Sequence, residues 1–230
     1  MDKLLQAFRN TFEGHPYLHR NSTLGDAIAS YLYDDMALLG RSPKLVERVE
    51  LGREVVNTRN RIKGRDGRRG DGTFGELIPG VTSIREKGYL VRRGPVATLQ
   101  IGAEVKIVST KMIAQIDRVM SDLRGQADTF RRLSPRAIAV GIVGVNFADE
   151  YTGYEGKRQH IAKIAPGREA DEVVRRINQF VRPHYDELVL LPFRATNRSP
   201  FFFEWVNGTE TSLEYSSAIL RLSNEYNARF

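Results

Sequence analysis

Two acidic residues of this chain, Glu104 and Glu155, are each followed two positions later by a lysine, in the tripeptides EVK (104–106) and EGK (155–157). A carboxylate can hold a divalent cation against a phosphate group, and a nearby ammonium can orient the attacking water. Hydrolysis of a phosphodiester bond needs this combination of residue types. With 28 acidic residues and 8 lysines in 230 positions, however, roughly one such tripeptide is expected by chance. The surrounding sequence has to distinguish the two.

The surroundings favour Glu104 and Lys106, which lie in a predicted strand over residues 96–108. One face of this strand would carry Leu99, Ile101, Ala103, Val105 and Ile107, and the other Thr98, Gln100, Gly102, Glu104 and Lys106. Since a strand rises roughly 3.4 Å per residue, the two charged residues would lie about 7 Å apart on one face. The alternative is an ion pair on a solvated sheet face, worth roughly a few tenths of a kcal/mol. EGK (155–157) lacks a strand pattern and is predicted to lie in a surface loop.

The elements that must position these residues follow from periodicity and capping signals. A helix is predicted over 43–63, with Ser42 as its N-cap and Pro43 at its first position. The segment GYLVRRG (88–94) is separated from 96–108 by Gly94-Pro95, a turn signal that predicts an antiparallel hairpin. Further helices are predicted over 1–12, 24–39, 110–132, 168–181 and 210–227, with a buried strand over 136–147 and a strand over 187–193 followed by FFFEWV (201–206).

This order of elements predicts an α/β fold with a mixed central sheet flanked by helices and an N-terminal helical extension. We treat the chain, residues 1–230, as a single domain. Within it we expect an N-terminal helical part (1–63), a core of hairpin, helix and strand (64–150), and a C-terminal part (151–230) that completes the fold.

The chain has no cysteine and four scattered histidines, which excludes disulfides, thiolate catalysis and zinc-thiolate sites. Any metal would therefore be held mainly by carboxylates, which favours Mg²⁺ or Mn²⁺. No apolar run approaches the roughly 20 residues of a membrane span, and the first ten residues carry charges too early for a signal peptide. We expect a cytoplasmic protein without a membrane partner.

The net charge of +7 comes largely from arginine, which supplies 27 of the 35 basic residues. Arginine binds phosphate in a bidentate manner, so the composition favours a nucleic-acid partner, although codon usage in a GC-rich genome is an alternative cause. A glycine-broken basic segment could contact phosphates or be a solvated linker. Its basic residues are Arg59, Arg61, Lys63, Arg65, Arg68 and Arg69.

The order of a basic helix, a hairpin whose second strand carries ExK, a long amphipathic helix and a buried strand resembles the core of the PD-(D/E)xK, or restriction-endonuclease-like, nuclease superfamily. The resemblance covers residues 42–147, with the quoted core GYLVRRGPVATLQIGAEVKIVSTKMIAQIDRV. It implies a Mg²⁺-dependent endonuclease acting on DNA, with Glu104 and Lys106 in its active site. Small members of the superfamily often act in restriction or phage defence, and a homodimer would suit the cutting of two strands.

The superfamily also places an acid, usually Asp after Pro, on the preceding strand, but no Pro-Asp pair exists in this chain. In the predicted hairpin the partner of Glu104 is Glu86, which becomes the expected second metal ligand, with Asp71 and Glu76 as substitutes. The resemblance further implies a polar residue from the following helix, for which Gln115 is the candidate. Gln115 shares a polar stripe with Lys111, Arg118 and Asp122, and it could equally be solvent-facing. The missing Pro-Asp leaves a second hypothesis, a non-catalytic nucleic-acid-binding or scaffolding module of the same fold.

Overall fold

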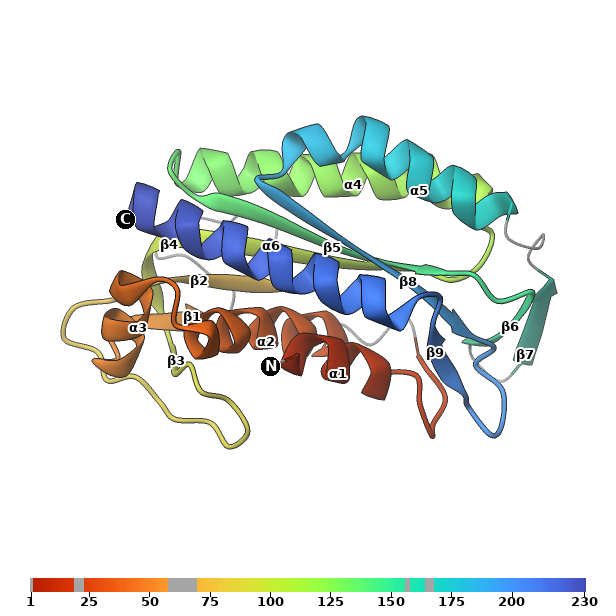
Figure 1. Ribbon diagram of the computed structural model, residues 1–230, viewed down its shortest axis with the longest axis horizontal. Helices are drawn as coiled ribbons and strands as arrows, with labels where there is room; N and C mark the ends of the chain where they lie inside the picture. Colours follow the sequence, from red (N-terminus) through yellow and green to blue (C-terminus); the bar gives the residue numbers. More distant parts are fainter. Residues whose placement is uncertain (1, 19–22, 58–69, 156–157, 164–167) are drawn as a thin grey trace.

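The computed structural model describes residues 2–18, 23–57, 70–155, 158–163 and 168–230. Its main feature is a sheet of seven strands in the order β3-β1-β2-β4-β5-β8-β9 (Figure 1). The strands β4, β5 and β8 are parallel to one another, whereas β2 is antiparallel to β4 and β9 is antiparallel to β8. The strands are β1 (Glu54–Asn57), β2 (Gly72–Leu77), β3 (Arg93–Gly94), β4 (Val96–Val108), β5 (Ile138–Asn146), β8 (Glu187–Ala195) and β9 (Phe203–Trp205).

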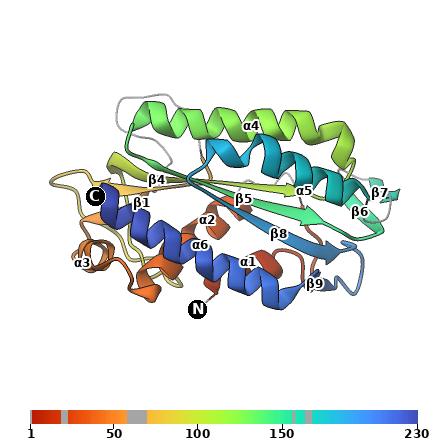
Figure 2. The same ribbon diagram turned by 45° about the horizontal axis from the view of Figure 1, so that its top comes forward.

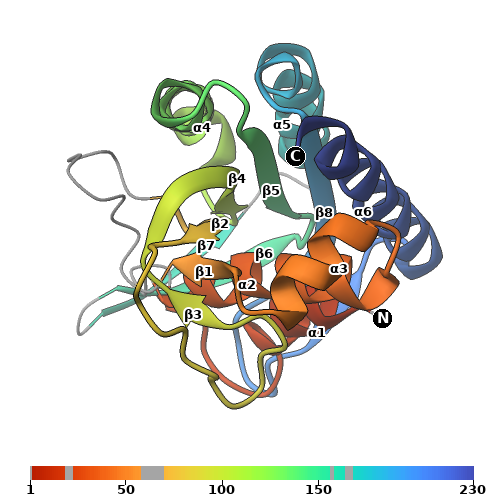
Figure 3. The same ribbon diagram turned by 90° about the vertical axis from the view of Figure 1, so that its left-hand side faces the viewer.

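Helices cover both faces of the sheet, so the predicted α/β fold with a mixed, helix-flanked sheet is confirmed. Two helices, α4 and α5, lie on one face, and α1, α2 and α6 lie on the other (Figures 1 and 3). β5 lies between these layers, and all nine of its residues are buried, as its continuous apolar sequence predicts. The helices are α1 (Lys3–Asn10), α2 (Thr23–Leu39), α3 (Pro43–Glu50), α4 (Met112–Leu133), α5 (Arg168–Phe180) and α6 (Gly208–Arg229). In the described ranges, no helix combines the length and apolarity needed to cross a membrane.

The third helix begins as predicted but is much shorter than predicted. The Ser42 hydroxyl accepts a hydrogen bond from the Leu45 amide at 3.1 Å, and Pro43 is the first helical residue. The helix ends at Glu50, because Gly52 takes a left-handed conformation with φ of 65° and the chain then turns into β1. The prediction of helix over 54–57 was therefore wrong. The basic segment from Arg59 to Arg69 lies outside the described residues.

The predicted hairpin of 88–94 with 96–108 is also wrong. β4 pairs with β2 on one side and with β5 on the other, and the 88–94 segment contributes only β3, which pairs in parallel with β1. The buried carboxylate of Asp34 explains why residues before β3 are not a strand. It accepts hydrogen bonds from the backbone amides of Leu90 and Val91 at 2.9–3.0 Å, so these amides bind to α2 instead of a neighbouring strand.

A second, separate sheet replaces the loop predicted near residue 155. β6 (Glu150–Glu155) and β7 (Arg158–Lys163) form an antiparallel pair beyond the end of β5. Tyr151 on β6 is buried, which a surface loop would not require. Of the second tripeptide, Gly156 and Lys157 lie outside the described residues, and nothing supports a functional role for it.

Candidate active site

Glu104 and Lys106 lie on the same face of β4, as the alternation predicts. The Lys106 Nζ is 2.8 Å from the Glu104 Oε1. The Glu104 side chain is only 8% exposed, against 32% for that of Lys106. The alternative of an ion pair on a solvated face therefore does not describe Glu104. Its second oxygen, Oε2, is buried and has no hydrogen-bond partner among the described residues.

A second acid near Glu104 is Asp71, which directly precedes β2. β2 and β4 pair from Gly72 and Ala103 onward, so Asp71 lies just beyond the end of this ladder, on the side of Glu104. The Asp71 Oδ2 accepts a hydrogen bond from the Val105 amide at 2.7 Å. Asp71, predicted as a substitute, is thus brought near Glu104.

Close packing fixes the position of Asp71 from both faces of the sheet. A Cβ on Gly70 would approach the Phe130 ring of α4 to 2.6 Å, and a Cβ on Gly25 in the first turn of α2 would approach the Asp71 carboxyl carbon to 2.6 Å. Only glycine allows these approaches. Helices from opposite sides of the sheet therefore determine where the Asp71 carboxylate lies.

The other two predicted acids are not brought to Glu104. Glu86 is half exposed and pairs with Arg93 at 2.9 Å. Arg93 belongs to β3, which directly precedes the start of β4 at Val96, and Glu104 lies eight residues, or about 26 Å, further along β4. Glu76 pairs with Thr98, six residues before Glu104 on β4 and thus about 20 Å from it along the strand. The assignment of Glu86 failed because it depended on the wrong hairpin.

On α4, the structure favours Asp122 over Gln115 as the residue beside Glu104. α4 runs back along the sheet from the end of β4 (Figure 2). Glu104 lies about 13 Å before that end, a distance that about nine helical residues span. This places position 121 or 122 level with Glu104, whereas Gln115 lies close to the start of α4. Asp122 belongs to the polar stripe predicted for this helix. A comparison of the rise per residue of a strand with that of a helix could have identified it from the sequence.

The electrostatics of the site reflect two carboxylates brought together in a buried place. Burial and then the charge of Asp71 raise the pKa of Glu104 to about 7, although Lys106 opposes this shift. Burial works against the charge of Lys106, but the neighbouring Glu104, Asp71 and Asp122 outweigh it, so the pKa of Lys106 is raised. Lys106 therefore carries a positive charge at neutral pH, and Glu104 titrates near neutrality.

A tyrosine pair missed in the sequence borders the same region. Burial and then the charge of Asp71 raise the pKa of Tyr17 to about 12. The buried Asn197, in the loop after β8, donates hydrogen bonds from its Nδ2 to the Tyr17 carbonyl oxygen at 3.1 Å and to the Tyr151 hydroxyl at 3.3 Å. Its Oδ1 accepts one from the Tyr17 amide at 2.7 Å. No local pattern could have identified this contact, because it joins positions 180 residues apart.

Comparisons of this chain with protein-family models, curated proteins and solved structures returned no match. The chemistry available at the site is that of two neighbouring carboxylates and an ammonium. Among the described residues there is no group of three or more His, Cys, Asp or Glu side chains arranged to hold a metal ion. Mg²⁺, however, commonly takes only one or two carboxylates and completes its shell with water and substrate phosphate. The buried, unpartnered Glu104 Oε2 beside Asp71 fits such an ion.

Proposed function

We propose that this chain is a metal-dependent nuclease that hydrolyses phosphodiester bonds of DNA. One observation carries the proposal: the Asp71 carboxylate, bound to the amide of Val105 at 2.7 Å, is near enough to Glu104 for its charge to raise the pKa of Glu104, and the Lys106 ammonium lies 2.8 Å from Glu104. These are the groups that metal-assisted hydrolysis needs, with Glu104 and Lys106 on β4 and Asp71 directly before β2. A sheet holds such groups more accurately than loops do.

The order of elements supports a restriction-endonuclease-like core once the first strand is corrected. β2 supplies an acid at its start, β4 carries the ExK tripeptide, and α4 then leads into the buried β5, parallel to β4. This is the pattern of the resembled superfamily, with Asp71 in place of the Asp of Pro-Asp. The residue before Asp71 is Gly70, whose contact with Phe130 leaves no room for a proline ring.

Each residue has a role that follows from its chemistry. Asp71 and Glu104 would hold Mg²⁺ or Mn²⁺, and the bound ion would supply Lewis acidity and an activated water. Lys106 would orient the attacking water and stabilise negative charge on the phosphate. Asp122, whose charge reaches both Glu104 and Lys106, would hold the ammonium in position.

DNA is the proposed substrate because the chain carries a net charge of +7 and is rich in arginine. A role in restriction or phage defence goes with the superfamily and is proposed on that ground alone. The competing proposal is a non-catalytic nucleic-acid-binding module. It is favoured by the finding that no three acids of the described residues are arranged to hold a metal ion together.

The deciding experiment compares metal binding and DNA cleavage. Calorimetry with Mn²⁺ alone and cleavage of supercoiled and linear plasmid with Mg²⁺, Mn²⁺ or EDTA would be measured for the wild type, Asp71→Asn, Glu104→Gln and Lys106→Met. We expect metal-dependent cutting that falls at least about 100-fold in each variant. The two carboxylate variants should also lose Mn²⁺ binding, and Lys106→Met should retain it.

Glu76→Gln and Glu86→Gln are matched controls, because they remove acids that lie away from Glu104. Both should cut DNA as the wild type does. Loss of activity in Glu86→Gln would refute the assignment of Asp71. A folded wild type that binds DNA but neither binds Mn²⁺ nor cuts would establish the non-catalytic module instead.

A further inference from the structure

The edge of β8 is incompletely covered. β9 pairs with it only over Phe193–Ala195, and a further hydrogen bond joins the Val206 amide to the Pro192 carbonyl oxygen at 3.1 Å. Within the described ranges, no strand pairs with this side of the first part of β8, from Glu187 to Leu191. An open strand edge is a template for a further strand.

The outward-facing backbone groups of this edge can be identified. The Pro192 carbonyl points outward to Val206, whereas the Phe193 carbonyl accepts from the Phe147 amide on the β5 side. Since the direction alternates along a strand, Leu188 and Leu190 present their amide and carbonyl groups outward. Pro192 has no amide hydrogen, which is tolerated only at an edge.

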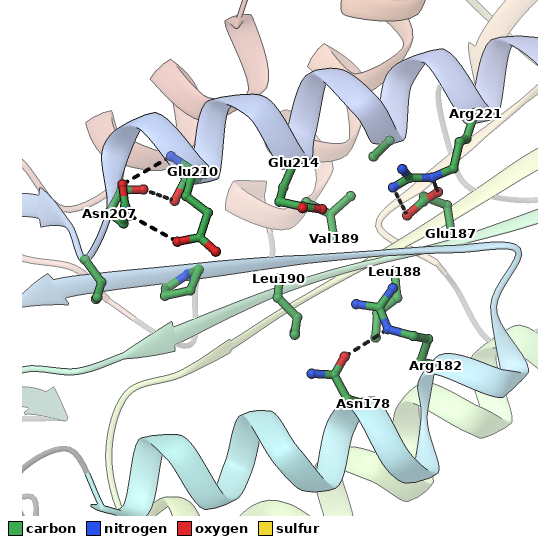
Figure 4. Close-up of a pocket in the computed structure, with 14 residues that line it drawn as sticks. Asn178, Arg182, Glu187, Leu188, Val189, Leu190, Asn207, Glu210, Glu214 and Arg221 are labelled. Carbon is green, nitrogen blue, oxygen red and sulfur yellow. Dashed lines mark hydrogen bonds and ion pairs between the residues drawn. The ribbon is translucent and has the colours of Figure 1, made fainter.

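The open edge is the floor of a pocket of about 340 Å³ between α5 and α6. Figure 4 shows β8 between the two helices, with Asn178 and Arg182 on one side and Glu210 and Glu214 on the other. The lining between them is apolar, from Leu188, Val189, Leu190, Pro192, Val206 and Ala218. This pocket, called the slot below, runs along β8 from Glu187 to Pro192 (Figure 4).

The two walls of the slot differ in charge. On the α6 side, the Arg221 guanidinium binds both oxygens of Glu187, at 2.7 and 3.1 Å, and this pair is neutral. Glu210 and Glu214 then make that wall acidic. On the α5 side, Arg182 donates a hydrogen bond to Asn178 at 2.8 Å, next to the side chains of Leu188 and Leu190 (Figure 4).

We propose that this slot binds an extended segment of a partner protein as an added strand, antiparallel to β8 and in line with β9. Successive side chains of a strand point to opposite faces. One alternate set would therefore face Glu210 and Glu214, which selects Lys or Arg. The other set would lie beside Leu188 and Leu190, which selects aliphatic residues. Main-chain hydrogen bonds to Leu188 and Leu190 would supply affinity, and the two walls would supply specificity.

The overall charge of the chain makes this preference testable. A net charge of +7 repels basic peptides in general and attracts acidic ones. Specific capture of a basic peptide would therefore have to come from the local acidic wall.

The test uses a fluorescein-labelled pentapeptide, Lys-Val-Lys-Val-Lys, and its charge-reversed analogue, Glu-Val-Glu-Val-Glu, with binding measured by anisotropy. We expect the basic peptide to bind more tightly than the acidic one. The double variant Glu210→Lys/Glu214→Lys should weaken it about tenfold or more. Glu50→Lys, an exposed change on α3, should leave it unaltered, and circular dichroism would confirm that both proteins are folded.

Backbone methylation of the peptide tests the strand geometry in the wild-type protein. In an antiparallel addition, the amides of the two valines point at β8, so N-methylation of the valines should abolish binding. N-methylation of the lysines should leave it. Absence of binding, equal binding of the acidic peptide, or indifference to both methylations would overturn the proposal.

Discussion

At the scale of single residues, the chemistry of the site rests on Glu104. The Glu104 carboxylate is nearly buried, lies near the charge of Asp71 and has one oxygen without a partner. These three features destabilise its charged form. The Lys106 ammonium offsets part of this cost, and a divalent cation would offset more. The environment that makes the charged Glu104 carboxylate unfavourable for the stability of the fold also makes it suitable as a metal ligand.

The pKa of Glu104 predicts a pH dependence of stability. It is near 4.5 in an unfolded chain and about 7 in the folded protein, so the folded state binds this proton more tightly. Stability contributed by the protonated group is then lost as pH rises from about 4.5 to about 7. In EDTA, we expect the free energy of unfolding of the wild type to fall relative to that of Glu104→Gln across this window, as measured by urea titrations. Parallel pH profiles for the two proteins would contradict the raised pKa.

At the scale of elements, the site depends on how closely α2 approaches the start of β2. Gly25 lies in the first turn of α2, where a Cβ would come within 2.6 Å of the Asp71 carboxyl carbon. Glycine is a weaker helix former than alanine, so its presence at this position lowers the stability of α2. The absence of a side chain at Gly25 leaves space for the Asp71 carboxylate.

Replacement of Gly25 by alanine should separate the effect of helix propensity from that of the space left for Asp71. Helix propensity alone would stabilise the protein by up to about 1 kcal/mol, but the added methyl must displace Asp71 or α2. We expect Gly25→Ala to lower the free energy of unfolding by about 1–3 kcal/mol and to weaken Mn²⁺ binding about tenfold. Gly208→Ala is the control, because its nearest neighbours would lie 3.9 Å away. A stabilised Gly25→Ala protein with unchanged Mn²⁺ affinity would disprove the role given to Gly25.

At the scale of the whole molecule, the two ends of the sequence are joined below the sheet. The buried carboxylate of Asp35 on α2 accepts hydrogen bonds from the amides of Lys3 and Leu4, at 3.0 Å each, and from the Tyr215 hydroxyl on α6 at 2.7 Å. Asp35 thereby caps α1 and links it to α6, whose Tyr215 is 180 residues from Asp35 in the sequence. The layer that supports the underside of β4 depends on this contact.

Removal of that carboxylate should destabilise the entire fold. Asp35→Ala leaves two buried donors and one part-buried donor without an acceptor, and we expect a loss on the order of 3 kcal/mol in the free energy of unfolding. Asp117→Ala is the control, because its carboxylate is 79% exposed where it pairs with Arg176, and it should cost no more than about 0.5 kcal/mol. Similar midpoints for the two variants in thermal unfolding would show that Asp35 does not join the helices.

The sequence by itself determined the elements whose periodicity is local. The apolar stripe of α4, the continuous apolar run of β5 and the alternation along β4 each depend on neighbouring residues, and all three were predicted. The same alternation placed Glu104 and Lys106 together on one face. Short-range steric and hydrophobic effects suffice for this much.

Only the tertiary structure decided which strand lies beside β4, and with it the second acid. Any strand offers the same backbone donors and acceptors, so the choice between 72–77 and 88–94 depends on distant contacts: Asp34 binds the amides of the latter, and Gly70 packs on Phe130 beside the former. When a different strand pairs with β4, every residue of β4 on that side has a different cross-strand neighbour. For that reason Asp71, and not Glu86, lies near Glu104.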